Sequence, residues 1–187
     1  ARTMPIWTGS AWATATDRSN GLSNPGAQIL LLCRGIYDSS GQLVAGLGLP
    51  DSRIDIESLK AFMVWCTAKG FMFDAYIQDA ISNDDLLNAI AYAGLGSISR
   101  DAGKYGVCWT EDAAPIEGVI NMGNIKARSF SVGYATASRA DEIEYGYFDR
   151  NNGNAWNSLR VLAPGVTVPT STARLSCTGI TSEAHAA

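Results

Sequence analysis

Three pairs of neighbouring carboxylates are the first residues in this chain that could do chemistry. The pairs are Asp84 with Asp85, Glu111 with Asp112, and Glu142 with Glu144. A glycoside hydrolase needs two carboxyl groups that face each other across a cleft. Two of these carboxylates could come together in this way in the folded chain. Asp84 and Asp85 fall in the first turn of a predicted helix, where the helix dipole favours anions. An acid-pair hydrolase is therefore one alternative.

The third pair, Glu142 with Glu144, is typical of a half-solvated strand. Glu142 and Glu144 would share one face of that strand, and Ile143 would lie on the other face. His185 is the one histidine of the chain, so a three-histidine zinc site is excluded within these residues. Catalysis by Ser-His-Asp or Cys-His needs an imidazole held by a scaffold, and His185 lies close to the end of the sequence.

Other candidate motifs favour structural roles. The segment "DRNNGN" (149–154) resembles the start of a calcium loop, but the twelfth position is Arg160, a cation. A hairpin turn is the better interpretation, because Asn and Gly tolerate positive φ. The pieces "AGLGLP" and "AGLGSIS" lack the third glycine of a dinucleotide loop and the Lys of a phosphate-binding loop. We assign no catalytic, cofactor-binding or metal-binding residue.

The four cysteines are predicted to be buried free thiols, with one disulfide as the alternative. They are Cys33, Cys66, Cys108 and Cys177. Each has an apolar or strand-like context, and no C-x-x-C spacing points to zinc.

Tryptophans are the strongest candidates for a binding surface. Trp7, Trp12 and Trp156 lie near predicted turns, so we expect partial exposure. Trp65 lies in an apolar helix and is expected in the core. Exposed tryptophans suit a carbohydrate platform or a subunit contact. We therefore keep a carbohydrate-binding or adhesin module as an alternative function.

The first half of the chain predicts two strands and three helices. Residues 3–16 predict two short strands joined at a turn that begins with Thr8. Asn24-Pro25 predicts a helix start, and a second helix is expected from about Asp55 to a stop at Gly70. The segment "FMFDAYI" (71–77) alternates and predicts a strand. Ser82 with Asp85 predicts a capping box for the third helix.

The second half predicts β-structure. Residues 96–110 predict a hairpin that turns at 101–103. The four candidate strands that follow are "RSFSVGYAT", "DEIEYGYFD", "AWNSLRVLA" and "TARLSCTGI". The expected core residues are Ile29, Leu32, Leu59, Phe62, Met63, Phe73, Leu87, Ile90, Val107, Phe130, Ile143 and Leu175.

Composition limits the class of protein. The chain has 187 residues, 47% of them apolar, so it can build a core. Its net charge is −4 and no Lys/Arg cluster stands out, which argues against nucleic acid as a partner. The longest apolar runs fall far short of the roughly 18 residues of a membrane span.

The predicted class is α+β, with a mainly antiparallel sheet, about three helices and a helix-strand-helix-hairpin subdomain. Residues 1–50 would hold the N-terminal strands and the Asn-Pro helix, and 51–118 the subdomain. Residues 119–187 would complete the main sheet, with strands from both ends of the chain. The last residues, "TSEAHAA", predict a helix start, so we expect a fragment of a longer protein.

The order of these pieces resembles the central region of phage tail-tip proteins of the host-specificity (J-like) family. The likeness covers roughly residues 5–180. Four stretches carry it: "PIWTGSAWATATDRSNGLSNPGAQILLLCRG", "GLGLPDSRIDIESLKAFMVWCTAKGFMFDAYI", "NDDLLNAIAYAGLGSISRDAGKYGVCWTED" and "GNIKARSFSVGYATASRADEIEYGYFDRNNGNAWNSLRV".

The resemblance implies a structural, non-enzymatic function. Such proteins form trimeric hubs that join the tail tube to host-recognition domains. It implies a virion location at the tail tip after synthesis in the bacterial cytoplasm. It implies other tail proteins and sister subunits as partners, with a homotrimer in the full-length protein. No residue role is carried over from the family. We expect an exposed apolar or strand-edge patch on such a module.

Overall fold

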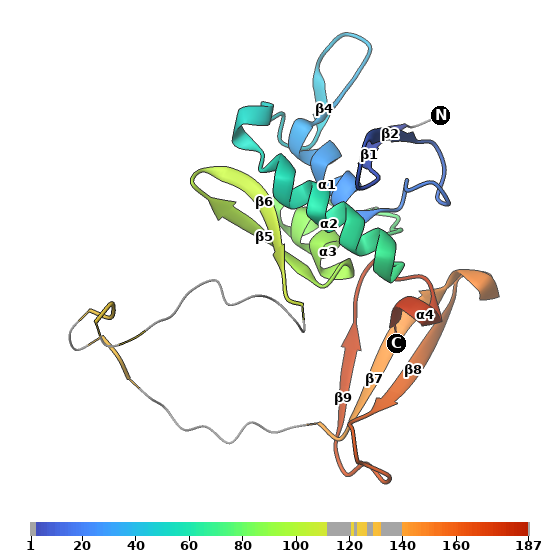
Figure 1. The fold of residues 1–187 in the computed structure, drawn as a ribbon. Helices are drawn as coiled ribbons and strands as arrows, with labels where there is room; N and C mark the ends of the chain where they lie inside the picture. The colour runs from blue at the N-terminus through green and yellow to red at the C-terminus, as the bar shows by residue number, and fades with distance from the viewer. Residues whose placement is uncertain (1–2, 112–120, 122, 127–128, 132–139, 187) are drawn as a thin grey trace.

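The computed structural model describes residues 3–111, 121, 123–126, 129–131 and 140–186. Two parts follow one another along the chain (Figure 1). Residues 3–110, here called the helical lobe, contain three helices and three hairpins. Residues 140–186, here called the sheet lobe, contain a three-stranded sheet and a short helix. The helices and strands of these described parts confirm the α+β class.

The three long helices begin where the sequence predicts. They are α1 (Pro25–Arg34), α2 (Ile56–Lys69) and α3 (Asn83–Ala93). Each is capped by a side chain that accepts a hydrogen bond from the backbone N–H three residues later: Asn24, Asp55 and Ser82. Gly70 ends α2 in the left-handed conformation, with a φ of 73°.

The core of the helical lobe lies between these helices. Eight predicted core residues are confirmed as buried there: Ile29, Leu59, Phe62, Met63, Phe73, Leu87, Ile90 and Val107. Leu32 is partly buried and packs against the same cluster, and so do Trp65 and Trp109. Because α1 and α2 contribute to one cluster, residues 3–50 and 51–110 share a single core.

The strands of the helical lobe form three separate hairpins. They are β1 (Met4–Trp7) with β2 (Trp12–Ala15), β3 (Ile36–Tyr37) with β4 (Leu43–Ala45), and β5 (Gly96–Asp101) with β6 (Lys104–Trp109). The predicted hairpin at 96–110 is confirmed, and its turn uses positive φ at Ala102 and Gly103. The structure also has two short 3-10 helices, η1 (Asp51–Arg53) in this lobe and η2 (Arg150–Asn152) in the sheet lobe.

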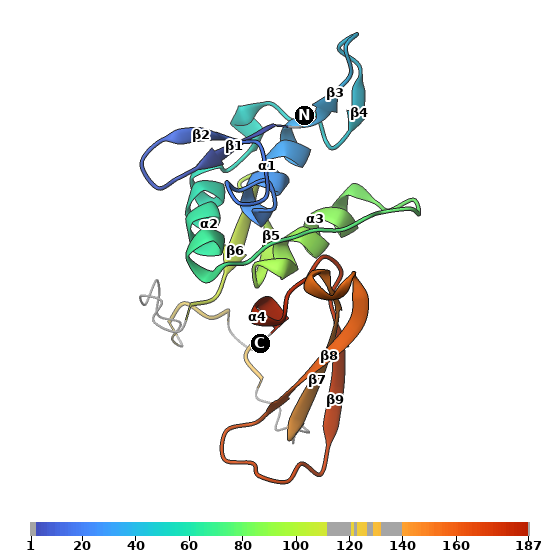
Figure 2. The same cartoon turned by 90° about the vertical axis from the view of Figure 1, so that its right-hand side faces the viewer.

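The sheet lobe is built on one central strand. It pairs β7 (Glu142–Asp149) with β8 (Ala155–Leu162) in antiparallel register and with β9 (Thr172–Ser176) in parallel register. The predicted hairpin turn at 149–154 is confirmed: Asp149 accepts a hydrogen bond from the Asn151 N–H, and Gly153 and Asn154 have positive φ. Short helix α4 (Glu183–Ala186) lies beside β7 (Figures 1 and 2).

The expectation of one main sheet with strands from both ends is wrong. Among the described residues, β1 pairs only with β2, and the sheet of β8, β7 and β9 stands apart. The N-terminal hairpin instead contacts α1 and α2, because its inward residues Met4, Ile6 and Ala15 belong to the helical core. The candidate strand 128–136 lies largely outside the described residues, and its described residues 129–131 form no strand.

Residues 71–77 form an extended connection and not the predicted strand. The Phe73 N–H donates to the Ser23 carbonyl, whereas the Asp74 N–H donates to the Gly179 carbonyl. The backbone of this connection thus binds two different segments, one in each lobe. It forms no continuous series of strand hydrogen bonds with either segment. Alternation in this stretch reflects the burial of Phe73 and the partial burial of Phe71 against the same core.

Three predicted core residues are exposed. They are Phe130, Ile143 and Leu175. On the sheet, α4 spans only about 6 Å, and it lies near Tyr147, which is 2% exposed. Ile143 lies four residues away, about 13 Å along the strand, so no described element covers it. Alternation identified the apolar face correctly, but the sheet has no second layer at that end.

Asp74 joins the two lobes through charged hydrogen bonds. Its carboxylate accepts from the Ser23 hydroxyl at 2.6 Å and lies 2.9 Å from an Arg18 guanidinium nitrogen. Arg150 of the sheet lobe reaches the same carboxylate at 3.3 Å. We call Arg18, Ser23, Asp74 and Arg150 the Asp74 clasp. It connects an N-terminal loop, the 71–77 connection and the end of β7.

The cysteines differ in environment. Within the described residues, which include all four cysteines, none forms a disulfide. Cys33 and Cys66 are buried as predicted, and burial raises the pKa of Cys33 to about 11 and of Cys66 to about 12. Cys108 is exposed, contrary to the prediction, because it lies on the outer side of the β6 edge. No described helix is long and apolar enough to cross a membrane.

Candidate interaction surfaces

The structure separates the three predicted surface tryptophans into two groups. Trp7 and Trp12 lie opposite each other on the β1–β2 hairpin, with ring centroids 5.5 Å apart in an edge arrangement. Trp156 lies on β8 of the sheet lobe. They therefore belong to different sheets and do not form one groove.

The hairpin pair is largely engaged within the helical lobe. Trp7 is partly buried and packs against the core, while Trp12 is 42% exposed. The ammonium of Lys60 lies 4.6 Å from the Trp7 ring centroid and 5.8 Å from that of Trp12. This cation occupies the position that a ligand would need over the Trp7 ring, so the pair serves mainly to hold the hairpin on α2.

Trp156 is in a different situation. Its side chain is 59% exposed and forms an edge-on contact with Phe148, with centroids 5.1 Å apart. The indole crosses the Cα of Gly146: a Cβ placed on that glycine would fall 2.2 Å from the indole Cζ2. Only glycine allows this close approach. One side of the ring therefore rests on backbone.

A charged cluster surrounds this tryptophan. Glu144 accepts a hydrogen bond from Arg174 Nε at 2.9 Å and lies 3.6 Å from the Arg160 guanidinium. The hydrogen bond from Arg174 is the main cause that holds the pKa of Glu144 below its ordinary value, and Arg160 adds to it. Register explains the cluster, since Glu144 is the direct partner of Arg160 on β8 and of Arg174 on β9.

We call this side of the sheet the Trp156 face. It contains a depression of about 300 Å³, lined by Glu144, Gly146, Trp156, Ser158, Arg174, Leu175 and Ser176. Sequence reasoning found Trp156 and named Glu144 only as half of a carboxylate pair, but it did not connect Trp156 with the residues around it. The signal for Arg160 was available in a predicted hairpin register, whereas Arg174 required knowledge of a parallel pairing.

The opposite side of the sheet is apolar. Ile143 lies opposite Val161, and Tyr145 lies opposite both Leu159 and Leu175. Ile143 is 39% exposed, Val161 41% and Leu175 53%. We call Ile143, Tyr145, Leu159, Val161 and Leu175 the apolar face. The expected exposed apolar patch is therefore present.

Each described carboxylate of the three sequence pairs has a neighbour of its own. Arg100 binds Asp84, Ser82 donates to Asp85, Trp109 Nε1 donates to Glu111, Thr172 donates to Glu142, and Arg174 donates to Glu144. Asp112 lies outside the described residues. Among the described members, the carboxylates form contacts with donors and not with one another.

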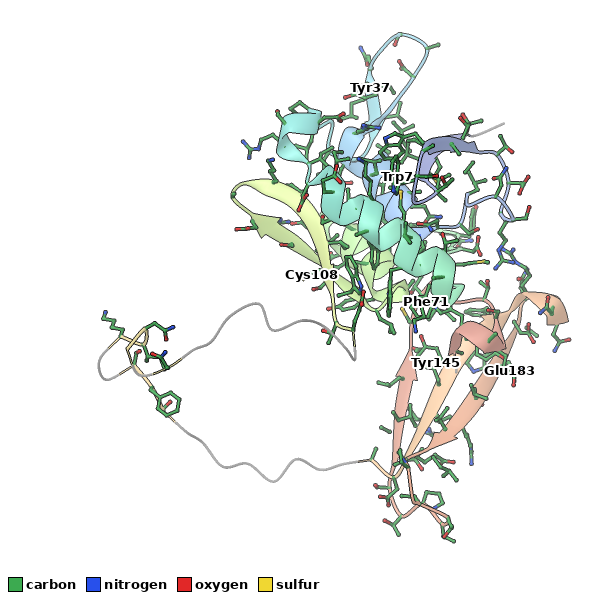
Figure 3. All side chains as sticks on the ribbon, viewed as in Figure 1. Trp7, Tyr37, Phe71, Cys108, Tyr145 and Glu183 are labelled. Atoms are coloured by element: carbon green, nitrogen blue, oxygen red, sulfur yellow. The ribbon has the colours of Figure 1, made fainter. Side chains whose placement is uncertain are left out.

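His185 sits where the lobes meet. Its Nε2 lies 2.6 Å from the Ala93 carbonyl, its Nδ1 receives the Met72 N–H at 3.5 Å, and its ring stacks on Phe71 at 4.9 Å (Figure 3 labels Phe71). Donation to a carbonyl requires a proton on Nε2, which leaves Nδ1 as the acceptor. These partners are backbone groups and an aromatic ring, so the imidazole acts as a structural link.

The environment of His185 predicts a pH-dependent stability. Burial lowers its pKa below the ordinary value of about 6.5, so the folded state favours neutral imidazole. The contribution is therefore complete above about pH 6.5 and is lost as the pH falls through the lower folded-state pKa. We expect the melting temperature to fall as the pH is lowered from 7.5 to 5.5.

The matched variant is His185→Phe, which keeps an aromatic ring against Phe71 but does not titrate. Calorimetry at several pH values is expected to show a shallower pH dependence for the variant, because no other side chain has an ordinary pKa in this window. Equal slopes in both proteins would contradict the assignment.

Comparisons with known proteins leave the geometry as the basis for function. A scan of the sequence against protein-family models finds no match, and a search of curated proteins also finds none.

Proposed function

We propose that this chain is a non-catalytic structural module of a bacteriophage or prophage tail-tip hub, which contributes to tail assembly and host attachment. The order of sequence pieces described above supports this proposal by resemblance. The apolar face of the sheet lobe supports it by physical argument. The module would act at the virion tail tip, with sister copies and other tail proteins as its partners.

The apolar face is the observation that carries the proposal. Ile143, Val161 and Leu175 are large apolar side chains that lie together on one end of a sheet, at 39–53% exposure. Large contiguous exposed apolar patches mark protein or membrane interaction sites and ligand-binding grooves. Removal of such surface from water gains about 25 cal/mol per Å², and association occurs where this gain exceeds the cost of bringing two chains together.

Strand edges next to this face give a second mode of contact. In the described part of the chain, β7 is the sole sheet neighbour of β8 and of β9, so each presents one unpaired backbone edge. Arg160 on β8 and Arg174 on β9 add charge along these edges. Charged edge strands resist indiscriminate pairing, which suits a defined partner.

Self-association is the direct test. Sedimentation equilibrium of the purified chain is expected to show oligomers whose population rises with concentration. The double variant Val161→Asp with Leu175→Asp is expected to remain monomeric, because two carboxylates would have to be buried in the contact. Electron microscopy with gold-labelled antibody against the chain is expected to mark the end of the tail distal to the capsid.

The matched control is Ser158→Asp with Ser176→Asp, which adds the same charge to the opposite side of the same strands. It should associate like the wild type. A wild-type chain that stays monomeric at every concentration would contradict a role for the apolar face, and label on the capsid or along the tail shaft would contradict the tail-tip location.

A further inference from the structure

We infer that the Trp156 face is a binding site for an oligosaccharide, with the Trp156 indole as the platform on which one pyranose ring stacks. This inference goes beyond the proposed assembly function and uses the other side of the sheet. The two surfaces share only Leu175, and the residues that would contact the sugar, Trp156 with Glu144, Ser158, Arg174 and Ser176, lie on the other side of the sheet.

The geometry of the platform is the first argument. Trp156 lies diagonal to Gly146 across the β7–β8 pair, since its direct partner is Phe148 and the partner of Gly146 is Ser158. With no Cβ on Gly146, the indole rests on the strand and leaves its outer side exposed. Phe148 meets it at an interplanar angle of 76°, which restricts rotation of the ring.

The polar rim is the second argument. A sugar ring has an apolar side of C–H groups and an edge of hydroxyl groups that both donate and accept hydrogen bonds. Around the indole, Glu144 accepts, Arg174 donates, and the hydroxyls of Ser158 and Ser176 do both. Glu144 is held by Arg174 and by Ser158 Oγ at 3.4 Å, so the rim is ordered before a ligand arrives.

The third argument is extent. Trp156 and Ser176 also line a second hollow of about 710 Å³ between the sheet and the 74–76 segment. Tyr76, 86% exposed, and Arg150 and Asn154 line this hollow. The indole thus stands where two hollows adjoin, each within the size range of small-ligand sites. A chain of several sugar units fits this arrangement better than a single compact molecule.

The charges around Trp156 are compatible with a neutral or an acidic oligosaccharide. Arg160 and Arg174 exceed Glu144 by one positive charge within the cluster. A neutral oligosaccharide would use the hydroxyl contacts alone, whereas an acidic one would also place an anionic group near Arg174. The experiment therefore uses both kinds of probe.

Isothermal titration with maltotetraose, tetra-N-acetylchitotetraose and the phosphorylated core oligosaccharide of bacterial lipopolysaccharide tests the site. We expect at least one to bind with a dissociation constant at or below roughly 1 mM. Trp156→Ala is expected to weaken that binding at least about tenfold, which corresponds to roughly 1.4 kcal/mol. Gly146→Val is expected to do the same without removing the indole, because the new side chain displaces it.

Trp12→Ala is the control, since it removes an exposed tryptophan of the other lobe and should leave binding unchanged. Circular dichroism establishes that each variant is folded. Absence of heat and of ligand-detected NMR signals for all three probes would overturn the inference, and so would equal affinity in wild type and Trp156→Ala. Binding by the core oligosaccharide alone would support the site and assign it to acidic glycans.

Discussion

Phe62→Asp is expected to leave the chain unfolded. The Phe62 side chain has no exposed surface, and its ring packs against Trp109 at 5.4 Å. It also fills the space over Gly94 and Gly96, where added Cβ atoms would lie 2.4 Å and 3.0 Å from the ring. An aspartate there would bury an unpaired charge, at a cost of several kcal/mol or more. Domains of this size have only about 5–15 kcal/mol of stability.

Far-UV circular dichroism and urea titration measure this result. The matched control is Val64→Asp, on the same helix at 40% exposure, which should fold with nearly wild-type stability. Comparison of the two separates the effect of burial from that of helix propensity. A soluble Phe62→Asp protein that melts cooperatively would show that the inner side of α2 is assigned incorrectly.

Asp74→Ala is expected to have the next largest effect, because it removes the acceptor of the clasp. Four donors bind this carboxylate: Arg18 and Ser23 of the N-terminal loop, Arg150 after β7 and, at 3.5 Å, the Thr181 hydroxyl. Hydrogen bonds to a charged group contribute about 1.5–3 kcal/mol. Since the carboxylate is 21% exposed, water screens part of that interaction, and we expect a loss on the order of 2 kcal/mol.

The loss should be localised. Hydrogen exchange is expected to accelerate in β7 and β9 more than in α2, since the substitution weakens the attachment of the sheet lobe and leaves the helical core intact. Asp38→Ala is the control, because Asp38 binds only its own exposed loop, through Ser40 and Gln42. Uniform acceleration in both lobes would contradict a clasp that acts between them.

The helical lobe could be predicted well because its signals are local. Asn24, Asp55 and Ser82 each cap a helix within three residues, so the sequence window contains both donor and acceptor. The buried stripe of α2 also follows from period alone. Pairing between distant strands has no such local signal. The parallel partner of β7 is β9, which lies about thirty residues later and follows an antiparallel hairpin.

Exposure of the sheet lobe could not be predicted for the same reason. Alternation showed that Ile143 and Glu142 lie on opposite faces, but it could not show whether anything covers either face. In the structure Glu142 is 7% exposed and Ile143 is 39% exposed, the reverse of a half-buried strand. The Trp156 site was recognised through one residue type, and its supporting contacts came from the fold.

The two cysteines in the helical core give the protein built-in reporters of its own transient opening. Cys33 and Cys66 are 1% and 0% exposed, and burial raises the pKa of both thiols. A thiol reacts through its thiolate, so neither can be alkylated until the surrounding helices separate. The rate of alkylation at Cys66 therefore measures how often α2 separates from the core. Cys108 is exposed, so its alkylation rate in the same sample measures the reactivity of the reagent with an accessible thiol.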